Sequence, residues 1–215
     1  MEKSISKDNY ETLCADWQKR FLQLDINSLT KKLPEIHSDG SRLIISHFHR
    51  RYAVSLQDGS ICCLDSDSPV SLFTRLNIYT LFWYCKDEVS ASNDWIPFRD
   101  LKDASPFGPA FQRSVIHVFS ETFSGHMKEL EQACRLLGGR KLNISDMGYE
   151  LDAFQCIPVQ FLFWDGDDEF PAQSNILFQR NCVDFIHVES IVSIASEGLA
   201  RLSEASGIPL QSGGF

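Results

Sequence analysis

The sequence predicts an α+β fold, with a mixed or largely antiparallel sheet covered by about five helices. The first observation behind this prediction is an apolar run from Ile157 to Trp164 that ends in an acidic turn and is followed by a second apolar run ending at Phe178. This pattern is typical of two strands joined by a tight loop. The second observation is a group of short apolar runs between residues 43 and 64, two of them joined by an Asp-Gly dipeptide, which is a strong hairpin signal. The third is a set of longer segments whose apolar residues recur at helical spacing.

The strands are expected to form one sheet. Residues 148–154 are expected to be an edge strand that leads into a central strand at 157–164, because apolar side chains point to both faces of the second segment. An antiparallel meander supplies the remaining strands. Its expected strands cover residues 43–48, 52–56 and 60–64.

Helices are expected to cover this sheet. Segment 69–85 begins at a proline and is apolar nearly all the way round, which predicts a buried helix. Segment 110–138 reads as two amphipathic helices separated at Gly125. The C-terminal helix follows the helical period most closely. The expected helices cover residues 8–24, 26–33, 69–85, 110–138 and 187–205.

Length and composition predict a single domain. A chain of 215 residues with 43 % hydrophobic content can bury a full core. We expect this domain to span residues 1–207, with residues 1–66 able to form a small N-terminal lobe and residues 208–215 a flexible tail. The seven cysteines show no CxxC spacing and are expected to be reduced thiols.

The charge balance limits the kinds of partner. The formal net charge is −9 and adjacent basic residues occur only in pairs such as Arg50-Arg51, which argues against nucleic acid or an anionic membrane surface as the main partner. The sequence shows no signal-peptide pattern and no apolar run long enough to span a bilayer, so we expect a cytoplasmic protein. The residues do not identify a cofactor, and they agree with a monomer or a homodimer.

The loop after the central strand is the main candidate site. It carries four carboxylates between two aromatic side chains, and such close carboxylates repel one another unless they are screened. These residues are Asp165, Asp167, Asp168 and Glu169, flanked by Trp164 and Phe170. One interpretation is a solvated hairpin loop whose Asp side chains bond their own backbone. The other is a site with oxygen ligands for Mg²⁺ or Ca²⁺, or with a general acid/base, although the spacing departs from that of an EF-hand loop.

Two histidine patterns give further candidates. His187 stands where the C-terminal helix begins, near Glu189. A helix N-terminus lowers the pKa of an imidazole and can hold it neutral for proton transfer, and the alternative is a simple capping role. His47 and His49 are two residues apart and are expected to share one face of a strand, either as a pair that chelates a metal or as part of a solvated face.

Three stretches resemble one known family. Residues 95–101 (WIPFRDL) resemble its W-[IV]-x-F-R-[ED]-L segment, and residues 107–113 resemble the aromatic-rich stretch after it. Residues 159–178 resemble an apolar strand that ends in W-x-G-D-[DE]-E-F-P and continues to N/Q-I-L-F. This pattern is similar to that of an uncharacterised bacterial and archaeal family, domain of unknown function 3786, over roughly residues 10–205. This chain has Gln179 where we expect the family to carry Asp, so no role is assigned to a carboxylate there.

The resemblance implies a shared fold but no activity, with a hint of redox or one-carbon metabolism in anaerobes. Our first hypothesis is therefore a non-catalytic binding or accessory module of anaerobic-type metabolism. In it Trp95, Phe98, Arg99 and the loop 164–171 form a recognition surface for a small molecule or a protein partner. The residues favour it because no nucleophile is paired locally with a base, and no nucleotide loop is present.

The second hypothesis is an enzyme that uses the acidic loop. Asp167, Asp168 or Glu169 would act as acid/base or as Mg²⁺ or Ca²⁺ ligands, Arg99 would fix an anionic substrate, and His187 would assist. The two hypotheses predict different geometries. A catalytic carboxylate should be desolvated in a concave pocket, whereas a recognition loop should project from the surface.

Overall fold

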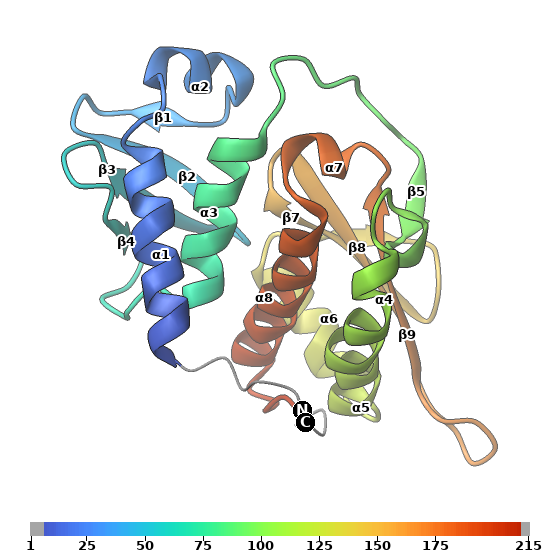
Figure 1. The fold of residues 1–215 in the computed structure, drawn as a ribbon. Coiled ribbons are helices and arrows are strands. Elements are labelled where there is room, and N and C mark those ends of the chain that lie inside the picture. The colour runs from blue at the N-terminus through green and yellow to red at the C-terminus, as the bar shows by residue number, and fades with distance from the viewer. Residues whose placement is uncertain (1–6, 212–215) are drawn as a thin grey trace.

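Two antiparallel sheets with helices packed around them form the fold, which a computed structural model describes for residues 7–211 (Figure 1). The α+β class is therefore confirmed, but the strands form two sheets and not the single sheet expected. The first sheet has the order β1-β2-β3-β4, with strands His37–Ser38, Arg42–His47, Arg50–Ser55 and Ile61–Cys63. The second has the order β5-β9-β8-β7-β6, with β5 to β9 at Trp95–Pro97, Arg140–Leu142, Met147–Phe154, Ile157–Trp164 and Gln173–Gln179.

The first lobe consists of the first sheet and three helices. Ser71 caps the start of α3, where its hydroxyl oxygen accepts a hydrogen bond from the N–H of Thr74 at 3.0 Å. The helix packs between α1 and α8. It is not buried all round as expected, because Phe73, Trp83 and Tyr84 are about two-fifths exposed. The helices of this lobe are α1 (Lys7–Phe21), α2 (Ile26–Lys32) and α3 (Leu72–Tyr84).

The second lobe is built on β8, which lies in the middle of its sheet as expected. Its alternating side chains Ile157, Val159, Phe161 and Phe163 have no exposed surface. The expectation that residues 148–154 form an edge strand is wrong, since β6 pairs outside β7. Ion pairs hold this added strand: Arg140 contacts the carboxylates of Glu150 at 2.7 Å and Asp152 at 2.6 Å on β7.

Helices cover the side of the second sheet that faces the first lobe (Figure 1). The break expected at Gly125 is present, with φ at 73°, and another left-handed glycine, Gly207, ends α8. α8 is the central helix, because it packs against both α3 and α6. No helix among residues 7–211 is long and apolar enough to cross a lipid bilayer. The helical segments are η1 (Phe98–Asp100), η2 (Ser105–Phe107), α4 (Gly108–Phe111), the π-helix η3 (Gln112–His117), α5 (Val118–Phe123), α6 (Met127–Leu136), α7 (Cys182–Phe185) and α8 (Val188–Ser206).

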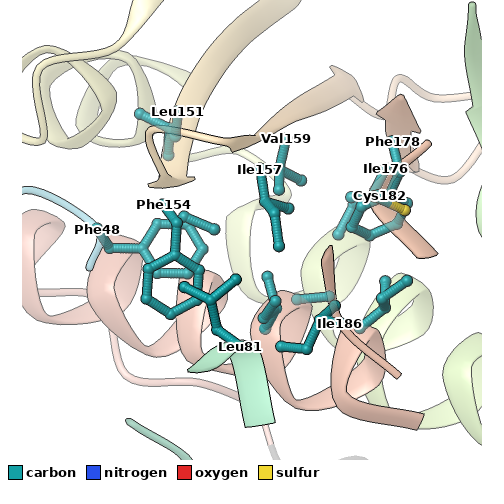
Figure 2. Close-up of a cluster of buried hydrophobic side chains, with 14 of the residues drawn as sticks. Phe48, Leu81, Leu151, Phe154, Ile157, Val159, Ile176, Phe178, Cys182 and Ile186 are labelled. Carbon is teal, nitrogen blue, oxygen red and sulfur yellow. The ribbon is translucent and has the colours of Figure 1, made fainter. Parts of the chain in front are cut away.

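The turn between β2 and β3 joins the two lobes. Phe48 and His49 occupy it with φ values of 44° and 61°, so the chain reverses directly after His47. The expectation that His47 and His49 lie on one face of the same strand is therefore wrong. The N–H of Phe48 donates to the carbonyl oxygen of Ala153 on β7 at 3.1 Å. Figure 2 shows Phe48 within the same buried cluster as Phe154, so the core is continuous across the lobes.

Close packing of α8 against this turn requires a glycine. A Cβ on Gly198 would lie 2.6 Å from the ring of Phe161 and 2.9 Å from that of Phe48. The lobes therefore meet at a contact with no space for an added methyl group.

The C-terminal segment after α8 folds back onto the second lobe as far as the structure describes it. The N–H of Gln211 donates to the hydroxyl oxygen of Thr122 at 3.0 Å. The rest of the expected flexible tail, residues 212–215, lies outside the described residues. All seven cysteines are free thiols, as expected.

Candidate functional site

The loop between β8 and β9, residues 165–172, projects away from the helices and beyond the rest of its sheet (Figure 1). We call it the hairpin loop. Trp164 and Gln173 pair across its base. All four carboxylates of the candidate site lie in this loop, and Asp167, Asp168 and Glu169 are exposed. The loop stands out from the surface and does not line a closed cavity.

Two of its carboxylates fix the backbone of the loop. Asp167 Oδ1 accepts hydrogen bonds from the N–H groups of Glu169 at 2.9 Å and Phe170 at 2.8 Å. These bonds hold the pKa of Asp167 below its usual value. Asp165 Oδ1 accepts a bond from the N–H of Gly125 at 2.9 Å, which ties the loop to the turn before α6. For Asp165 and Asp167, these bonds agree with the interpretation of the loop as a solvated hairpin whose Asp side chains bond backbone groups.

The other two carboxylates, Asp168 and Glu169, face solvent. Within residues 7–211 neither forms an ion pair with a basic side chain. The structure does not bring Arg99 to Glu169: the side chain of Arg99 is 82 % exposed and lies 4.0 Å from the carboxylate of Asp100. Arg99 is therefore not placed to act with the acidic loop.

Aromatic side chains border a shallow hollow at the base of the loop. Phe170 is 63 % exposed and Trp164 is 36 % exposed, although both are large apolar residues. The hollow has a volume of about 330 Å³. It is lined by Asp146, Trp164, Asp165, Phe170, Pro171 and Gln173.

The predicted recognition surface is only partly assembled. Trp95 pairs with Gln179 at one end of β9, and the hairpin loop begins at the other end, at Gln173. Six residue steps along a strand span about 20 Å, so Trp95 lies far from the loop. Phe98 is not on a surface at all, because it is 2 % exposed and its ring stacks on Phe111 with centroids 4.2 Å apart. Burial in the core is the better explanation of its place in the WIPFRDL segment.

His187 is a helix cap in this structure. Its Nδ1 accepts a hydrogen bond from the N–H of Glu189 at 3.3 Å at the start of α8. The ring lies 5.4 Å from that of Tyr84 on α3, and so does not belong to the hairpin loop on the far side of the second lobe.

A comparison with protein families gives one match. The family model of the domain of unknown function DUF3786 matches residues 25–201, which is most of the chain. The chain belongs to this family. No curated protein and no solved structure gives a significant match. The match includes residues of both lobes and the hairpin loop, and the description of DUF3786 names no activity.

A second cluster of charges in this DUF3786 chain lies between the lobes and was not predicted. Glu204 on α8 bridges two arginines: one carboxylate oxygen contacts Arg50 of β3 at 2.5 Å and the other contacts Arg201 at 2.6 Å. Glu197, one turn before Arg201, accepts hydrogen bonds from the hydroxyl groups of Ser71 at 3.0 Å and Thr74 at 2.8 Å. Side chains from both lobes therefore meet in one polar network.

Burial sets the electrostatics of this cluster. Burial lowers the pKa of Arg201, and the nearby charge of Arg50 lowers it further. Burial raises the pKa of Glu204, but the two arginines outweigh that effect and leave the pKa below its usual value. The signal in the sequence was the spacing of Glu197 and Arg201, which puts a charged pair on one face of α8 beside its apolar positions.

His47 lies at the same boundary and is a fully packed residue. Its Nδ1 lies 2.6 Å from the carbonyl oxygen of Ala153 and its Nε2 lies 3.3 Å from the amide nitrogen of Asn77. Since the carbonyl can only accept, Nδ1 carries the proton and Nε2 accepts from the amide. Burial lowers the pKa of His47 to about 4. The described part of the chain contains no group of three or more His, Cys, Asp or Glu side chains that could hold a metal ion.

Proposed function

We propose that the protein is a non-catalytic recognition module whose hairpin loop docks a basic segment of a protein partner. The observation that carries this proposal is the large exposure of Phe170, at 63 %, on an ordered loop. The same loop presents the carboxylates of Asp168 and Glu169, which form no ion pair within residues 7–211. Exposed aromatic side chains beside a hollow are typical of the residues that dominate binding energy in protein interfaces.

The chemistry of the loop indicates the chemistry of the partner. Trp164 and Phe170 offer an apolar contact, and the carboxylates around them offer a field that attracts Lys and Arg. A partner segment with a basic residue next to an apolar one is complementary to both features. Its association should weaken as salt is added, because exposed charges are screened.

The loop is held in its shape before any partner binds. The carboxylates of Asp165 and Asp167 bond backbone N–H groups, and Gly166 lies so close to the returning chain that a Cβ there would be 2.8 Å from the nitrogen of Ala172. A loop that is already ordered loses less conformational entropy on binding, which favours affinity.

Exposure favours recognition over acid/base catalysis at this loop. A general acid or base at neutral pH usually owes its shifted pKa to desolvation in a concave site. Asp168 and Glu169 face solvent, and the hollow beside them is open and bordered by Trp164 and Phe170. No observation at the loop favours the enzyme hypothesis.

The test is selection from a random peptide library displayed on phage, with the purified protein immobilised. Selected peptides should carry Lys or Arg next to an apolar residue. Phe170→Ser should weaken their binding about tenfold or more, as expected for the loss of an interface anchor. Leu136→Ser is the matched control, because Leu136 is 58 % exposed on α6, and it should leave binding unchanged.

The charges are tested separately in the double variant Asp168→Asn, Glu169→Gln. It should bind the same peptides more weakly and with a smaller dependence on salt. Selection of acidic peptides, or binding that Phe170→Ser leaves intact, would overturn the proposal.

A further inference from the structure

A pocket of about 160 Å³ lies between the two lobes, away from the hairpin loop. We call it the junction pocket. β3 and the segment before α3 form one side of it, and α8 forms the other. The side chains that matter most to its chemistry are Arg50, Tyr52, Ser71, Glu197, Arg201 and Glu204.

Arg201 is the central residue of the junction pocket, and it is not fully paired. The residue is 8 % exposed, and its Nη1 donates to Glu204 at 2.6 Å. Its Nε is buried and has no hydrogen-bond partner among residues 7–211. A buried guanidinium N–H without an acceptor is unfavourable, so a ligand acceptor that reaches this edge of Arg201 would be favoured. The guanidinium edge that contains Nε binds carboxylates with two parallel hydrogen bonds.

The remaining charges restrict what that ligand can be. The pocket contains two arginines and two glutamates, and Glu204 already shares its carboxylate between Arg50 and Arg201. Glu197 is held on one wall by the hydroxyl groups of Ser71 and Thr74. A ligand with an excess of negative charge would be repelled by both glutamates, whereas a ligand with one carboxylate and one cationic group is complementary to the whole set.

Size restricts the ligand further. A volume of 160 Å³ is below that of most cofactor and drug-sized sites and corresponds to roughly five water molecules in the liquid. Glycine, alanine and serine fall in this range.

We propose that the junction pocket binds a small α-amino acid, with its carboxylate on Arg201 and its ammonium group directed to Glu197. Both of these ligand contacts lie on α8, and the opposite wall of the pocket, with Arg50 and Ser71, belongs to the first lobe. This site is independent of the hairpin loop, and changes in Phe170 leave it intact.

Isothermal titration calorimetry of the whole protein tests the proposal with glycine, L-alanine and L-serine as probes. At least one of them should bind with a Kd of about 1 mM or tighter. Acetate and inorganic phosphate should bind at least tenfold more weakly, because the first lacks the ammonium group and the second carries excess negative charge. L-Lactate, which has a hydroxyl group in place of the ammonium group of alanine, should also bind more weakly than alanine.

Variants locate the site. Arg201→Lys keeps the positive charge but removes the guanidinium edge that forms two parallel hydrogen bonds with a carboxylate. It should weaken amino-acid binding at least tenfold. Arg135→Lys is the matched control on α6, where the arginine is 66 % exposed and pairs with Glu131, and it should have no effect. Glu197→Gln should remove the preference for an amino acid over acetate.

Ala200→Phe keeps the test decisive if Arg201→Lys unfolds the protein. Ala200 lines the junction pocket but is exposed, so a ring there blocks the entrance without entering the core. The proposal is overturned if none of the three amino acids binds, if Ala200→Phe binds them as well as the natural protein does, or if acetate, phosphate or lactate binds equally well.

Discussion

The hairpin loop and the junction pocket contain similar charged side chains in opposite settings. In the loop, Asp168 and Glu169 face solvent without basic partners among the described residues. In the junction pocket, Glu204 is shared by two arginines, one of which is 8 % exposed. A dense run of charged residues in the loop lies on an exposed surface, where each charge is screened by solvent. The few charged residues of the junction pocket are buried together, so each one changes the electrostatic energy of its neighbours.

The two regions also differ in how strongly they are tied to folding. The loop is an extension beyond the sheet, and the carboxylates of Asp165 and Asp167 bond to a neighbouring turn or within the loop. The junction is part of a continuous core in which Phe48 and Gly198 touch. Substitutions at the junction should therefore change stability, and substitutions in the loop should change binding alone.

The largest effect is expected from the protonation of His47. Its pKa is lowered from 6.5 to about 4 in the folded protein by burial, so the unfolded chain takes up a proton at a higher pH than the folded one. The stability that follows from this difference is fully present above pH 6.5 and is lost as the pH falls towards 4, with a total of about 3 kcal/mol. Urea unfolding at pH 7 and at pH 4.5 measures it.

His47→Asn is the control for this prediction. Asn keeps a donor that can reach the carbonyl oxygen of Ala153 but does not titrate. Over the same pH range the natural protein should lose about 2 to 3 kcal/mol more than the variant does. An equal loss in both proteins would mean that His47 is not held neutral at the junction.

The next effect concerns Gly198. Replacing a glycine within a helix by alanine usually stabilises a protein by about 1 kcal/mol, but the added Cβ here would meet Phe161 at 2.6 Å and Phe48 at 2.9 Å. We expect Gly198→Ala to destabilise the protein by about 1 to 3 kcal/mol in urea unfolding. Gly108→Ala, where a Cβ has nothing within 4 Å, should be neutral or slightly stabilising. A stable Gly198→Ala variant would show that the lobes are not closely packed there.

The sequence predicted the elements better than their arrangement. The helical period of residues 188–206 and the apolar faces of β8 are local properties of the sequence. The helix and the strand that they predict are both confirmed. The division into two sheets was not predicted, because pairing depends on which strands meet in space. The expected meander implied a reversal after residue 48, but its position at Phe48 and His49 was not predicted, since it uses φ values of 44° and 61° that sequence patterns assign to Asn or Gly.

The candidate site could be predicted in part. The sequence predicts that the acidic residues and their aromatic neighbours share one hairpin loop, and the structure brings Trp164, Asp165 and Phe170 together at one hollow. The sequence could not show that Trp95 lies at the far end of β9 or that Phe98 is buried, because an aromatic residue in a short motif serves a core and a surface equally well. The junction pocket joins residues about 150 positions apart, such as Arg50 and Arg201, and no local pattern reports such a contact.

A smaller effect is expected within the loop. Asp167→Ala removes the acceptor for the N–H groups of Glu169 and Phe170, so hydrogen exchange at these two amides should become faster while the melting temperature barely moves. Asp168→Ala, one residue further on, should leave the exchange rates unchanged. Faster exchange in β8 or β9 would show instead that the loop supports the sheet.

The smallest effect on stability is expected from Phe170→Ser. The side chain is 63 % exposed, so little buried apolar area is lost and the free energy of unfolding should change by less than about 0.5 kcal/mol. A large loss of stability would mean that Phe170 packs in the fold and is not a free anchor for a partner.

We expect the buried charges of the junction pocket, and not the exposed carboxylates of the hairpin loop, to form the small-molecule site. A titration of the ¹⁵N-labelled protein with glycine, alanine and serine, followed by two-dimensional NMR, tests it most directly. At least one amino acid should shift the Nε–H signal of Arg201 and the backbone amide signals of residues 66–68, 70 and 71, while those of residues 165–170 stay in place. Shifts confined to the hairpin loop, or none with any of the three amino acids, would contradict it.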